Sequence, residues 1–134
     1  MHNHADFFSA AAAVGSIPVL DVEAMRLLFR VECAGEVFYN GLADRVAHAQ
    51  AAELLRRNGR EARGHAERLR RAIGVKLGTP FEPSADDLAP YAMPLPDEIS
   101  PELLSIIVTA ELNGDTGYQR WADRETDPEV QRLL

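Results

Sequence analysis

The sequence predicts an all-α protein, and three observations support this prediction. Apolar residues recur at three- and four-residue steps over long stretches, which is the period of a helix packed on one side. The stretch 21–55 is repeated at 100–134 with a constant offset of 79 residues. Five prolines fall between residues 74 and 99, in a connection without helical period. Two helix pairs separated by a long connection are typical of a helical bundle.

Composition excludes several other classes of protein. The 134 residues are enough for one core, and a single cysteine excludes an internal disulfide framework. No apolar run reaches the roughly 18 residues that a membrane helix needs, so no membrane is expected as a partner. The net charge of −7 argues against nucleic acid as a partner, because a phosphate backbone binds a basic surface. Seven arginines crowd residues 56–71, but glutamates alternate with them at helical spacing, which favours a solvated helix face.

The N-terminal residues 1–20 are expected to form a mobile arm or a short helix. Phe7, Phe8 and the alanine run that follows resemble the core of a signal peptide. A secretory signal begins with basic residues, however, whereas this chain begins with two histidines and an acid. We therefore expect a cytoplasmic protein, with its helical domain over residues 21–134.

The first helix pair is predicted at 21–45 and 47–73. Asp21 is a good N-cap, and Glu23 in the first turn favours the positive end of the helix dipole. The second helix is rich in alanine, leucine and arginine, which are good helix formers, and Gly74 is the expected stop.

The second helix pair follows a crossover at 74–99 and is predicted at 100–123 and 127–134. Ser100 is a good N-cap, and Pro101 suits the first helical position. The segment 103–108 is apolar on more than one face, so we expect helix 100–122 to be either central or at a subunit interface. We accordingly predict a homo-oligomer, a dimer formed through this helix.

The internal repeat has nine identities in 35 ungapped pairs, where composition alone would give roughly two or three. Glu32 is equivalent to Glu111, and Tyr39 is equivalent to Tyr118. Each glutamate interrupts an otherwise apolar stripe. Buried glutamates are rare unless they are paired or bound to metal, so the two positions point to a site.

His65 is a candidate third ligand. It lies on the apolar face of helix 47–73, where a histidine is either a metal ligand or a satisfied core residue. Gly35 and Gly114 lie one turn from the glutamates, and their missing side chains leave space either for close helix packing or for a bound metal.

Taken together, two Glu-x6-Tyr motifs, a histidine late on the second helix and a long crossover resemble the ferritin-like family, which includes the rubrerythrins. The resemblance covers about residues 21–134. It implies a four-helix bundle with the crossover between its second and third helices, and a di-iron carboxylate type of site. Glu32, Glu111 and His65 would then be ligands of iron, or of manganese or zinc, with Tyr39 and Tyr118 beside them. The implied activity is that of an oxidoreductase or an iron-handling protein.

Two departures from the family pattern weaken this expectation. The family has a glutamate three residues before the histidine, where this chain has Ala62; Glu61, four residues before the histidine, is a candidate replacement with shifted geometry. The fourth helix has only about two turns in this sequence, so it is truncated or completed by another chain. The alternative is a degenerate bundle without metal that acts as a structural or interaction module.

Overall fold

The computed structural model describes residues 6–91, 95 and 99–134, and within them the secondary structure is helical, without strands. The all-α prediction is therefore confirmed. The helices, in chain order, are α1 (Phe7–Gly15), α2 (Val22–Ala43), α3 (Ala49–Leu77), α4 (Ala85–Leu88), α5 (Pro101–Arg124) and α6 (Pro128–Leu133). In this part of the chain, no helix combines the length and the apolar character needed to cross a membrane.

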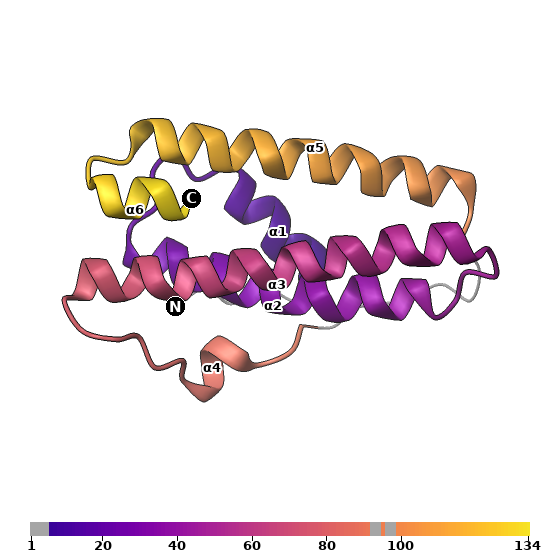
Figure 1. The fold of residues 1–134 in the computed structure, drawn as a ribbon, viewed down its shortest axis with the longest axis horizontal. Coiled ribbons are helices and arrows are strands. Elements are labelled where there is room, and N and C mark those ends of the chain that lie inside the picture. The colour runs from indigo at the N-terminus through magenta and orange to yellow at the C-terminus, as the bar shows by residue number, and fades with distance from the viewer. Residues whose placement is uncertain (1–5, 92–94, 96–98) are drawn as a thin grey trace.

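Helices α2 and α3 form a long antiparallel hairpin, and α5 runs along one side of it (Figure 1). Helix α5 is parallel to α3 and antiparallel to α2, while the short α1 lies between α5 and α2 (Figure 1). Thus residues 1–20 contain a short helix packed into the fold, where the ring of Phe7 stacks on that of Phe38 with centroids 5.3 Å apart.

The internal repeat is visible in the positions of the helix starts. The offset of 79 residues relates Val22, the first residue of α2, to Pro101, the first of α5. The same offset relates Ala49, the first of α3, to Pro128, the first of α6. Each of the four helices is capped by a side chain that accepts a hydrogen bond from the backbone of its first turn.

Helix α3 continues one turn beyond the expected stop at Gly74. It ends at Leu77, and Gly78 caps it with a φ of 74°, a left-handed conformation that suits glycine. Gly74 has a packing role, because a Cβ placed there would lie 3.4 Å from the carbonyl oxygen of Thr79. The missing side chain lets the chain turn back closely over the end of the helix.

The connection between α3 and α5 was expected to lack helical structure, but it contains α4. Ser84 and Asp87 form a capping box at this short helix. The guanidinium of Arg26 on α2 donates two hydrogen bonds to Asp87, at 3.0 and 3.1 Å. Arg30, one turn further on, donates to the carbonyl of Ala89 at 2.8 Å and lies 3.6 Å from the ring centroid of Tyr91. Two arginines of α2 thereby attach this segment to the hairpin.

The C-terminal half of α5 is anchored to the turn between α1 and α2. The indole nitrogen of Trp121 donates to the carbonyl of Ile17 at 2.7 Å, and Arg120 and Arg124 donate to neighbouring carbonyls at 3.1 and 2.9 Å. An ion pair between Lys76 and the buried Glu125, at 2.8 Å, joins the end of α3 to the corner between α5 and α6.

The N-terminal half of α5 is much more exposed than its apolar sequence led us to expect. Ile107 is buried, but four large apolar side chains are open to solvent: Leu104 (36% exposed), Ile106 (63%), Val108 (59%) and Leu112 (62%). A central position for this helix is therefore wrong for a single copy of the chain. The other expectation, a subunit interface, stays a prediction.

The two repeat-related glycines occupy different environments, which leads to a prediction. A Cβ at Gly35 would lie 3.6 Å from the Cβ of Ala62 on α3, whereas a Cβ at Gly114 meets nothing within 4 Å. We expect Gly114→Gln to raise the free energy of unfolding by about 0.5–1 kcal/mol, because glutamine is the better helix former. Gly35→Gln should lower it by about 1–3 kcal/mol through overpacking. Urea unfolding of both variants checks this, and equal effects at the two positions would contradict it.

Candidate functional site

Two hydrogen bonds between α2 and α5 organise the candidate site. The hydroxyl of Tyr118 on α5 donates to Oε1 of Glu32 on α2, at 3.0 Å. The hydroxyl of Tyr39 on α2 donates to Oε1 of Glu111 on α5. Each glutamate is thus bonded to the tyrosine of the other half of the repeat. The exchange follows from geometry, since in an antiparallel pair a residue two turns forward on one helix faces a residue two turns back on the other.

His65 joins this site from α3. Its imidazole stacks on the ring of Tyr118, with centroids 4.3 Å apart and an angle of 9° between the ring planes. Trp121, on α5 like Tyr118, meets the tyrosine ring edge-on, with ring centroids 5.4 Å apart. Tyr118 therefore contacts a predicted ligand on each of two helices: it bonds the carboxylate of Glu32 and stacks on the imidazole of His65.

Arg68 adds a positive charge that the sequence did not lead us to expect here. Its Nη2 lies 2.9 Å from Nδ1 of His65, one turn earlier on α3. A guanidinium has only N–H groups to offer, so it is the donor and the imidazole Nδ1 is the acceptor. The alternation of arginines and glutamates over residues 56–71 predicts a solvated face for Arg68, but its separation of three residues from His65 puts both on one side of the helix.

The carboxylates of the site resist ionisation. Burial raises the pKa of Glu32 to about 8; the nearby charge of Glu111 acts in the same direction, while the bond from Tyr118 and the charge of Arg68 oppose the rise. Burial also raises the pKa of Glu111, again opposed by its tyrosine bond. Burial and the charge of Arg68 lower the pKa of His65. The folded protein thus disfavours two negative charges and an additional imidazolium here.

Glu61 and Ala62 are the two positions of α3 considered for a further carboxylate. Glu61 has an exposed side chain whose carboxylate lies 3.5 Å from the guanidinium of Arg57, and its charge contributes to raising the pKa of Glu111. Ala62 is buried in the contact between α2 and α3, beside Gly35. At the position of Ala62 on α3, the chain therefore makes an apolar contact, where the ferritin-like pattern has a carboxylate.

The donor types of the site fit a metal of the iron, manganese or zinc kind, because two carboxylates and an imidazole are ligands that these ions accept. The side-chain positions do not form a closed coordination sphere. Among the described residues, no three histidine, cysteine, aspartate or glutamate side chains converge on one point. Each carboxylate is engaged by a tyrosine and the imidazole by Arg68, so these partners must rearrange for Glu32, Glu111 and His65 to share an ion.

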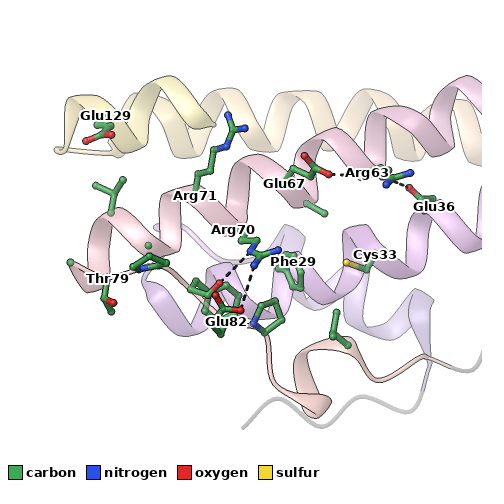
Figure 2. A pocket seen from close by; sticks show the side chains of 18 residues that line it. Phe29, Cys33, Glu36, Arg63, Glu67, Arg70, Arg71, Thr79, Glu82 and Glu129 are labelled. Atoms are coloured by element: carbon green, nitrogen blue, oxygen red, sulfur yellow. Dashed lines mark hydrogen bonds and ion pairs between the residues drawn. The ribbon is translucent and has the colours of Figure 1, made fainter.

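A separate surface hollow lies between α2, α3 and the segment 78–83 (Figure 2). Its charges are largely paired: Arg63 lies 3.9 Å from Glu36, and Arg70 lies 3.5 Å from Glu82 (Figure 2). The thiol of Cys33 is at its edge, where burial raises its pKa to about 11. A thiol of this kind is a poor nucleophile at neutral pH.

Comparison with family models, with curated proteins and with solved structures gave no match to this chain. The function is accordingly inferred from the chemistry of the residues around Glu32 and Glu111.

The raised pKa of Glu32 predicts a pH-dependent stability. Between the ordinary value of 4.5 and about 8, the folded protein holds a proton that the unfolded chain releases. The stability from this proton is complete below about pH 4.5 and is lost as the pH rises to about 8. In EDTA at pH 8.5 we expect Glu32→Gln to be more stable than the wild type, by at most about 5 kcal/mol.

At pH 5 the two proteins should differ little, because Glu32 is then protonated and resembles the amide. Thermal unfolding at both pH values measures the difference. Glu67→Gln, which removes the same charge from an exposed position of α3, is the control. A stability difference between Glu32→Gln and wild type that is the same at pH 5 and pH 8.5 would show that Glu32 has an ordinary pKa.

Proposed function

We propose that this protein is a ferritin-like helical bundle that binds a divalent metal ion, iron above all, through Glu32, Glu111 and His65. The observation that supports this proposal best is the reciprocal pair of tyrosine–glutamate hydrogen bonds, which holds two repeat-related carboxylates between α2 and α5. The order of the elements is compatible with a four-helix bundle whose long crossover, with α4, joins the second and third bundle helices.

The electrostatics of the site favour a cation. Burial raises the pKa of both carboxyls, and the charge of Glu111 adds to the rise at Glu32, so two adjacent carboxylates lack full compensation when they ionise. A divalent ion bound between them would supply that compensation and displace the protons. Each tyrosine bond engages one oxygen of its carboxylate, and the other oxygen is a potential ligand.

When bound, an iron ion would supply oxidoreductase or iron-oxidation chemistry, as the family resemblance implies. The chain's own residues have simpler tasks. Tyr39 and Tyr118 orient the two carboxylates, and the stacking of Tyr118 on His65 fixes the plane of the imidazole. Three ligands suit one metal ion with open positions for a substrate or an oxidant. A second ion would need ligands beyond Glu32, Glu111 and His65.

One observation favours the second candidate, a metal-free structural or interaction module. The guanidinium of Arg68 is close enough to lower the pKa of Glu32 and is bonded to His65, so the site already contains a cation. Together with Ala62, this arrangement would suit a bundle that has exchanged its metal for an internal positive charge.

Metal analysis distinguishes the two candidates. We expect protein loaded with Fe²⁺ under anaerobic conditions and then desalted to retain about one ion per chain. Glu32→Gln and Glu111→Gln should each reduce this stoichiometry at least tenfold, because each removes a charged ligand. Glu67→Gln is the matched control on the surface. If the wild type retains no more iron than the two ligand variants, the metal-binding proposal fails, and the metal-free structural or interaction module is the candidate that is left.

We also propose that two copies of the chain associate through the exposed apolar side of α5. Leu104, Ile106 and Val108 are equivalent in the repeat to Met25, Leu27 and Phe29, all of which are buried on α2. On α5 the equivalent apolar side chains are exposed to solvent. A second copy presents an identical surface, so a two-fold axis beside α5 would bury both at once.

Light scattering after size exclusion tests the association. We expect a dimer mass for the wild type and a monomer mass for Leu112→Glu, since a charge in a buried apolar contact is costly. Val37→Glu is the control, because Val37 is equally exposed (59%) but lies on α2. A monomeric wild type at micromolar concentration, or equal effects of the two substitutions, would refute the dimer.

A further inference from the structure

We propose that Arg68 restrains metal binding at this site by holding His65 in the tautomer that carries its proton on Nε2. The inference rests on the proposed metal site and adds a specificity-determining residue to it. The observation behind it is the 2.9 Å contact between Nη2 of Arg68 and Nδ1 of His65, in which only the arginine can donate.

This hydrogen bond is the reverse of the one that supports a metal-binding histidine. A ligating imidazole usually donates the N–H of its second nitrogen to a carboxylate or a carbonyl, which leaves the first nitrogen free for the metal. In this chain Nδ1 accepts, so the proton of the neutral ring lies on Nε2. A metal at Nε2 would have to displace that proton, and a metal at Nδ1 would have to displace Arg68. In both cases binding is easier once Arg68 has released the ring.

The charge of Arg68 acts in the same direction. The guanidinium is close enough to Glu32 and Tyr118 to lower the pKa of both groups. It therefore compensates part of the negative charge for which a metal ion would compete. A divalent ion that enters beside it meets repulsion from a like charge, which is strong where water is partly excluded.

The backbone provides space for this position of the arginine. A Cβ at Gly64 would lie 3.3 Å from Nη1 of Arg68, which is closer than an ordinary van der Waals contact. Glycine inside a helix costs about 1 kcal/mol relative to alanine, so a glycine in the middle of α3 is unfavourable for the helix itself. With a side chain at this position, the guanidinium would have to move by a few tenths of an ångström from its place against His65.

Two variants alter the contact between the arginine and the imidazole to different degrees. Arg68→Met removes the charge and the donor while it keeps much of the side-chain length. Gly64→Ala keeps the arginine, shifts its guanidinium by a few tenths of an ångström, and favours the helix. Arg71→Met is the control, because it removes an exposed guanidinium one turn further along α3.

The tautomer is measured first, on metal-free protein. Nitrogen-15 NMR of the imidazoles, with the His65 signals assigned by comparison with His65→Gln, should show a protonated Nε2 and a bare Nδ1 in the wild type. Arg68→Met should populate both tautomers. A wild-type His65 with its proton on Nδ1, or a tautomer that Arg68→Met leaves unchanged, overturns the inference whatever the metal results are.

Metal affinity is measured next by titration with Co²⁺, a coloured stand-in for Fe²⁺ that is stable in air. We expect Arg68→Met to bind Co²⁺ at least tenfold more tightly than the wild type, Gly64→Ala to show a smaller gain, and Arg71→Met to show none. Equal affinities of wild type and Arg68→Met would overturn the restraint and leave the metal site standing. If no protein of the series binds Co²⁺, both the site and the restraint are refuted.

Discussion

The crossed hydrogen bonds between α2 and α5 are the interaction on which the arrangement of the other elements depends. Tyr39 and Tyr118 each reach across to the glutamate of the opposite helix, which requires α2 and α5 to be antiparallel and in one register. A shift of α5 by one turn would leave two partly buried carboxylates without their donors, and a buried group without its partner is costly. The polar pair therefore specifies a register that apolar packing alone leaves loosely defined.

The same interaction explains why the glutamates are tolerated in apolar stripes. Burial makes ionisation unfavourable at both positions, and the tyrosine hydroxyls and the guanidinium of Arg68 offset part of this cost. A metal ion would offset it further. The guanidinium of Arg68 and a bound metal ion are thus two ways to compensate the negative charge of Glu32 and Glu111, and the chain has the residues for both.

Helix α5 is anchored to the rest of the fold in its C-terminal half and exposes apolar side chains in its N-terminal half. Its C-terminal half is anchored by Trp121 and two arginines to the turn between α1 and α2, and the ion pair of Lys76 and Glu125 lies just beyond its end. Its N-terminal half contacts the hairpin mainly through Ile107 and the site glutamate, and it leaves apolar side chains exposed. One helix thus carries both the site residues Glu111 and Tyr118 and the exposed apolar side chains.

The sequence by itself determined what depends on local interactions. Helix starts at Val22, Pro101 and Pro128 follow from capping residues and a first-turn proline, and the repeat places Glu32 and Glu111 at equivalent points of two apolar stripes. The end of α3 could not be placed in this way, because Gly74 looks like a stop, whereas the helix continues to Leu77 and is capped by Gly78. Local chemistry identifies a glycine without saying whether it turns the backbone or makes room for another segment.

Only the tertiary structure decided which side chains meet. Helical periodicity assigns a residue to a face of its own helix, but the partner on another helix depends on direction and register, which arise from packing. For this reason the exchange of tyrosines between the two glutamates was not predictable from the motifs. Arg68 was predicted on a solvated face and lies against His65. A long side chain can bend to either side of its helix, so the spacing of three residues permits the contact with His65 without requiring it.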